Sequence, residues 1–257
     1  AITSDHYPLY CDFKKPTGLE EYPKAEGDLR IGNYFLTYCK GTDGVIDYDR
    51  TGRIIAKMNA DIVCLQGLDK ETERSEGIDQ LNVLAQKANM YDYFAKAIDY
   101  KGGEFGVGIL TKEEPVSVDR YQMAGKSEMR AAMVVEYEKF VVASTNFDTD
   151  MAKRIEALQT LETKLSAYNK PAFLLGYFNE GDLESEFFQM VKSNWNLLSA
   201  DKSTEVSGKK RRLDFIVSLK SHNVNVTQVD VIESLSGVDV TVASTHYPLS
   251  CDFSGLK

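Results

Sequence analysis

Short apolar runs rich in Val and Ile recur along the chain and alternate with stretches of helical periodicity. The runs that we expect to form strands cover residues 30–39, 61–66, 106–110, 133–137, 141–145, 172–175, 213–218, 224–232 and 238–244. Short runs of this composition are typical of buried strands. Strands that alternate with helices in one chain indicate an α/β protein built in packed layers.

Three stretches place apolar residues at the three-to-four residue spacing of an amphipathic helix. They cover residues 54–58, 78–88 and 151–165, and a weaker pattern predicts a fourth helix over about 183–192. Asn59 is suited to a left-handed stop after the first helix. Asp148 or Thr149 is available to cap the third. Periodicity does not distinguish a single sheet from two packed sheets.

The composition is that of an ordinary globular protein, with 43% hydrophobic and 27% charged residues among 257. The net charge of −9 argues against non-specific binding to nucleic acid or to anionic membranes. No apolar stretch is long enough to span a membrane, and no signal peptide is recognisable. We therefore expect a soluble protein. Because Ala1 is not preceded by Met, a secreted or periplasmic origin with the signal peptide removed stays open.

The four cysteines contain no C-x-x-C pair, so the sequence has no zinc or redox motif of that kind. Cys64 lies in an apolar run and is expected to be a buried, inert thiol. The sequence leaves the disulfide state of the four cysteines open.

One segment occurs twice. Residues 4–13 match residues 244–253 at eight of ten positions, and the first copy has Asp where the second has Thr. We divide the chain into this extra segment with its Pro- and Gly-containing tether, residues 1–27, and a domain over residues 28–257. The first copy is an inert remnant, or pairs on an exposed sheet edge, or competes for the place of the second copy. Competition between chains would give strand-swapped self-association.

Four short motifs occur in a specific order: Leu65–Gly67, Ser144–Asn146, Gly176–Asn179 and Ser244–Pro248. In order and spacing they resemble the endonuclease/exonuclease/phosphatase superfamily of metal-dependent phosphoesterases, which reads L-Q-E, S-T-H, G-D-F-N and S-D-H at these places. The resemblance covers roughly residues 28–253. It implies two packed β-sheets with helices on both outer faces, a four-layer α/β/β/α sandwich.

The resemblance also assigns roles. Hydrolysis in this family needs a divalent metal such as Mg²⁺ on oxygen ligands, an activated water, and donors to the phosphoryl oxygens. Three functional positions are retained, and they are the candidate catalytic residues: Asn179, Asp214 and His246. Five are replaced: Phe35 stands for Asn, Gly67 for Glu, Asn146 for His, and Tyr177 and Thr245 each for Asp.

The replacements fall on chemical positions, while neighbours such as Gln66 and Thr145 still match the family. We interpret this pattern as a rebuilt site, by design or by selection, in which the metal and its hydrolytic chemistry are lost. The expected result is a pocket for a small, partly aromatic molecule, and it leaves a new catalytic activity open. The residues expected to line this pocket are Phe35, Thr37, Gly67, Asn146, Phe147, Tyr177 and Thr245.

Two alternatives remain: a residual metal-dependent phosphodiesterase, and a catalytically silent interaction protein. Plainer structural roles also stay open, because His246 could be a packed imidazole and Phe35 and Phe147 could be core residues. The sequence does not identify the ligand or the oligomeric state.

Overall fold

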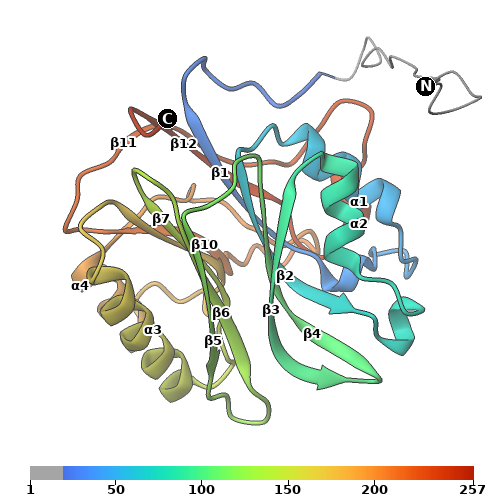
Figure 1. The fold of residues 1–257 in the computed structure, drawn as a ribbon, viewed down its shortest axis with the longest axis horizontal. Coiled ribbons are helices and arrows are strands. Elements are labelled where there is room, and N and C mark those ends of the chain that lie inside the picture. The colour runs from blue at the N-terminus through green and yellow to red at the C-terminus, as the bar shows by residue number, and fades with distance from the viewer. Residues whose placement is uncertain (1–19) are drawn as a thin grey trace, which may run out of the picture.

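The structure is a computed structural model that describes residues 20–257. Its strands form two mixed sheets of six strands each (Figure 1). The first sheet has the order β11-β12-β1-β2-β4-β3. Its strands are β1 (Leu29–Phe35), β2 (Ile62–Lys70), β3 (Tyr91–Tyr100), β4 (Gly103–Thr111), β11 (Asn225–Val231) and β12 (Leu249–Ser254). The second has the order β5-β6-β7-β8-β10-β9. Its strands are β5 (Ser117–Met123), β6 (Arg130–Glu136), β7 (Val141–Asn146), β8 (Ala172–Tyr177), β9 (Trp195–Leu197) and β10 (Asp214–Leu219).

The sheets pack face to face, and helices cover both outer faces, as the four-layer prediction required (Figure 1). Inward-facing residues such as Ile31, Cys64 and Met133 form the central core. Helices α1 (Tyr48–Lys57) and α2 (Gln80–Ala88) cover the first sheet. Helices α3 (Met151–Ser166) and α4 (Glu186–Asn194) cover the second. Each helix therefore buries its apolar stripe against one sheet.

The predicted helix ends were confirmed for α1 and wrong for α3. Asn59 follows α1 with φ of +52°, which confirms the predicted left-handed stop. The predicted caps of α3 are wrong by one or two residues, because the side chain of Asp150 accepts from the backbone nitrogen of Lys153. Asp148 is already engaged, with Oδ2 3.0 Å from Nε of Arg130.

Two predicted strands differ from the structure. The run over 238–244 is wrong, because Asp239 caps a short helix there, α5 (Val240–Ala243). The run over 30–39 ends as a strand at Phe35, and a 3₁₀ turn, η1 (Thr37–Cys39), follows. All three residues of that turn have positive φ. Strands β3, β5, β9 and β12 have no counterpart among the predicted apolar runs. Two of them, β3 and β5, have many partly exposed positions and therefore lack a long apolar run.

A buried ion pair fastens the last strand to the first. Nε of Arg30 lies 2.6 Å from Oδ1 of Asp252, and both side chains are almost fully buried. The same guanidinium donates to the carbonyls of Met58 and Tyr22, so part of the predicted tether packs on the domain. The repeat over residues 4–13 lies outside the described residues, and the domain boundary at residue 28 stays a prediction.

Cys39, Cys64 and Cys251 are buried free thiols, while Cys11 lies outside the described residues. No helix within residues 20–257 is both long and apolar enough to cross a membrane.

Candidate functional site

The site lies at one end of the sandwich, where two pairs of parallel strands finish. Phe35 ends β1 beside Gln66 of β2, and Asn146 ends β7 beside Tyr177 of β8. Asp214, the first residue of β10, pairs with Tyr177. Because parallel strands carry their C-terminal residues to the same edge, positions far apart in sequence converge here.

Phe35 occupies the space above Gly67. A Cβ placed on Gly67 would lie 3.3 Å from Cε2 of Phe35 and 3.3 Å from the backbone nitrogen of Thr37. Gly67 has φ of +74°, and the pairing of β2 with β4 shifts register between Gln66 and Leu68. Gly67 is therefore the extra residue of a bulge that favours glycine. A Glu at position 67 would require a change in the backbone conformation of this residue and a smaller or displaced side chain at Phe35.

Three rings pack together at the centre of the site. The ring centroid of Phe35 lies 4.6 Å from that of Tyr177 and 4.8 Å from that of His246. Tyr177 meets His246 edge-on at 5.0 Å. Such tilted and edge-to-face contacts are the favourable geometries for aromatic pairs. We call Phe35, Tyr177 and His246 the aromatic cluster.

Asp214 lies beneath this cluster and orients the imidazole. Its Oδ2 lies 2.6 Å from Nδ1 of His246, and both side chains are buried. Burial opposes the charged form of His246, yet the Asp214 carboxylate outweighs it and raises the pKa of the imidazole above its ordinary value. Burial, assisted by Asp214, raises the pKa of Tyr177 to about 12, so its phenol stays protonated at neutral pH.

The retained Asn179 has a structural task. It adopts φ of +55°, a conformation that Asn tolerates better than most residues. Its Nδ2 donates to the carbonyl of Phe147 at 2.7 Å and lies 3.4 Å from Oδ1 of Asn146. Asn179 thus fixes the turn after β8 against the end of β7.

The structure brings most of the predicted pocket residues together, with one exception. Thr37 and Thr245 meet through their hydroxyl oxygens at 3.1 Å beside the aromatic cluster. Phe147 lies apart, fully buried in the outer core against Phe178 and Phe187. Strand alternation explains this placement, because Phe147 follows the inward-facing Asn146 and points to the opposite face of the sheet.

A polar group deeper between the sheets was not predicted as part of the site. Nε2 of Gln66 donates to Oδ1 of Asn33 at 2.8 Å and to Oγ of Ser144 at 3.2 Å, and all three residues are buried. Their alternation with apolar residues in β1, β2 and β7 was visible in the sequence. This alternation does not indicate which strands lie opposite one another, so the contact between Gln66, Asn33 and Ser144 could not be predicted from it.

The residues present do not fit a magnesium ion. Within residues 20–257, no group of three or more His, Cys, Asp or Glu side chains is placed to hold a metal. Oδ2 of Asp214 is engaged with His246, and Glu205, which forms a backbone bridge with His246, pairs with Arg211 at 2.5 and 2.6 Å. Mg²⁺ prefers carboxylate and water oxygens, whereas Phe35 presents carbon at this place.

Comparison with known proteins agrees with this architecture. The sequence pattern of the Endonuclease/Exonuclease/phosphatase family matches residues 35–237. A comparison with curated proteins found no match. Among solved structures, an endonuclease/exonuclease/phosphatase from Beutenbergia cavernae is similar with a TM-score of 0.71 and 18% identity, over 90% of this chain and 73% of that one.

Two further structures are similar at the level of the fold. A mannosyl-6-phosphatase from Bacteroides thetaiotaomicron has a TM-score of 0.68 and 15% identity, over 88% of this chain and 99% of that one. The human Nocturnin catalytic domain with bound sulfate has a TM-score of 0.65 and 18% identity, over 89% of this chain and 93% of that one. Because the family pattern spans most of the chain and the sandwich matches, the protein belongs to the endonuclease/exonuclease/phosphatase family.

Proposed function

We propose that this protein is a hydrolytically silent member of its family that binds a small, partly aromatic molecule at the aromatic cluster. The observation that carries the proposal is the placement of Phe35, whose ring fills the space above Gly67. A carboxylate and a cation would need that volume. With carbon there and no second carboxylate at Tyr177 or Thr245, the family's metal-dependent hydrolysis lacks its electrostatic basis.

The cluster offers what an aromatic ligand needs. Phe35 and Tyr177 are only partly buried, so part of each residue can contact a ligand. An aromatic pair of good geometry contributes roughly 0.5–1.5 kcal/mol beyond its buried area. The protonated phenol of Tyr177 and the amide of Asn146 supply polar groups for orientation. Rings with a few polar groups are the usual composition of a small-molecule site.

The second candidate is a residual metal-dependent phosphodiesterase. It is favoured by the intact Asp214–His246 pair, whose 2.6 Å contact orients the imidazole as a general base requires. The third candidate, a silent interaction protein, uses neither the pair nor the cluster.

Calorimetric titration with Mg²⁺ and Mn²⁺, together with hydrolysis of bis(p-nitrophenyl) phosphate, separates the first two candidates. We expect no saturable metal binding below millimolar concentration and no metal-dependent hydrolysis. Saturable metal binding below millimolar concentration, or metal-dependent hydrolysis, would overturn the proposal and favour the phosphodiesterase.

Titration with indole, phenol and benzamide, followed by NMR, tests the binding itself. We expect saturable shifts that Tyr177→Ala abolishes and that Tyr91→Ala, an exposed tyrosine on β3, leaves unchanged. If none of the three fragments perturbs the aromatic cluster, the silent interaction protein is the better reading.

A further inference from the structure

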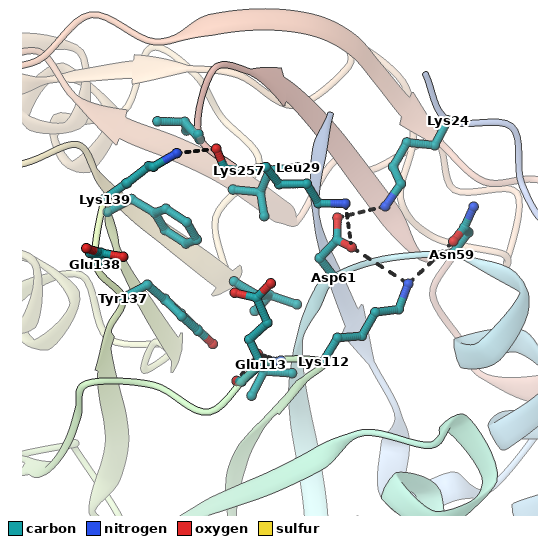
Figure 2. A pocket seen from close by; sticks show the side chains of 14 residues that line it. Lys24, Leu29, Asn59, Asp61, Lys112, Glu113, Tyr137, Glu138, Lys139 and Lys257 are labelled. Carbon is teal, nitrogen blue, oxygen red and sulfur yellow. Dashed lines mark hydrogen bonds and ion pairs between the residues drawn. The ribbon is translucent and has the colours of Figure 1, made fainter. Parts of the chain in front are cut away.

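A cavity lies where β1 and β2 begin and β4 ends, at the other end of these strands from the aromatic cluster (Figure 2). Its volume is about 580 Å³, within the range of small-molecule sites. The first sheet contributes Leu29, Ile62 and Thr111, and the turn between β6 and β7 contributes residues 137–140. The other lining residues are Lys24, Asn59, Asp61, Lys112, Glu113, Leu256 and Lys257. We call this space the distal cavity.

The distal cavity has an apolar floor. Tyr137 and Phe140 stack with ring centroids 4.8 Å apart and an interplanar angle of 25°. Leu29 and Ile62 lie on the facing sheet, and all four residues are buried in the central core. This surface suits the hydrocarbon or aromatic body of a ligand and supplies the nonpolar part of its affinity.

Its rim is basic. Three ammonium groups surround the single carboxylate of Asp61 (Figure 2): Lys24 at 2.7 Å, Lys257 at 3.2 Å and Lys112 at 3.7 Å. One carboxylate cannot neutralise three cations. Burial lowers the pKa of Lys24, the Asp61 carboxylate opposes that change, and Lys257 and Lys112 add smaller lowering contributions.

Other charges at the rim are exposed to solvent. Lys139 adds a fourth cation, which donates to the carbonyl oxygen of Lys257, and Glu113 and Glu138 bring the acidic residues of the lining to three. In a chain of net charge −9, the lining of this cavity therefore has a small excess of lysines, four against three acidic residues.

A buried hydroxyl lies in the lining without a hydrogen bond of normal geometry. The Oη atom of Tyr137 is buried, and the side chain extends from the second sheet toward the end of β4 (Figure 2). The nearby hydroxyl of Thr111 donates to the carbonyl of Glu113 at 2.9 Å, and its interaction with the Tyr137 hydroxyl only partly offsets the burial that raises the pKa of Tyr137. An unsatisfied buried hydroxyl is costly, so a ligand atom that pairs with it gains affinity.

We propose that the distal cavity binds a small organic anion, whose apolar body lies on Tyr137 and Phe140 and whose anionic head meets the lysines around Asp61. Carboxylates and phosphate monoesters share this chemistry. The site is separate from the aromatic cluster, because it uses the opposite ends of the same strands. This proposal therefore does not depend on whether the aromatic cluster binds a ligand.

Calorimetry with octanoate, octyl phosphate and 1-octanol tests the proposal on the full chain. We expect both anions to bind saturably and 1-octanol to bind about tenfold more weakly, because it lacks the charge-assisted contacts. Lys112→Met should weaken both anions about tenfold and leave 1-octanol unchanged. The matched control is Lys126→Met, an exposed lysine that pairs with Asp150 away from this cavity.

Phe140→Leu should weaken all three compounds, and thermal unfolding of each variant confirms that it is folded. The preferred anion identifies the natural head group. The proposal is overturned if neither anion binds at millimolar concentration. It is equally overturned if Lys112→Met leaves anion binding unchanged, or if 1-octanol binds as tightly as the anions.

Discussion

Replacement of Gly67 by Ala tests whether the ring of Phe35 fills the space above Gly67. Two effects oppose the new methyl group. The residue has φ of +74°, and a left-handed conformation costs an L-residue about 1–2 kcal/mol. The methyl would also lie 3.3 Å from Cε2 of Phe35, which is a tight contact. Overpacking of this kind adds about 1 kcal/mol.

Gly77→Ala is the matched control, because Gly77 has the same φ of +74° and nothing lies within 4 Å of its would-be Cβ. It measures the backbone cost alone. We therefore expect Gly67→Ala to lower the free energy of unfolding by about 1 kcal/mol more than Gly77→Ala. Part of this difference should disappear in a Phe35→Ala background, where the overlapping ring is removed.

Urea denaturation followed by circular dichroism gives these differences from the shift in midpoint at constant slope. Equal losses for Gly67→Ala and Gly77→Ala would refute the reasoning. That outcome would mean that free space lies above Gly67, and a metal ligand could then be accommodated there.

Other features give further testable outcomes. Asp252→Asn leaves Arg30 buried without its counter-charge, and we expect a loss of about 3–5 kcal/mol in urea denaturation. The pKa of His246 is raised in the folded state above the unfolded-state pKa near 6.5. The stabilisation that this gives is fully present below the unfolded-state pKa and is lost as the pH rises through the folded-state pKa. Unfolding midpoints should therefore fall across that window, and Asp214→Asn should remove the dependence. Deletion of residues 1–13 should leave the oligomeric state unchanged in light scattering, whereas a shift would support strand exchange.

Much of the fold could be predicted because fully buried strands appear in the sequence as short apolar runs. Strands β2, β7, β8 and β10 are buried along most of their length, and their apolar runs located them. Edge strands β3 and β5 have no such run. The run over 238–244 misled because alternating Val residues also suit a short helix once Asp239 caps it. Local pattern cannot choose between those two outcomes.

The amino-acid sequence was enough to predict which residues occupy the positions of the family's chemistry, because the spacing of the motifs is retained around Gly67, Tyr177 and His246. How these residues contact one another became visible only in the folded protein. The ring of Phe35 covers Gly67, while Phe147 faces the outer core. The distal cavity likewise joins Lys24, Asp61 and Tyr137, which share no motif. Contacts between separate strands depend on register and on sheet packing, and neither leaves a signal in the neighbouring residues.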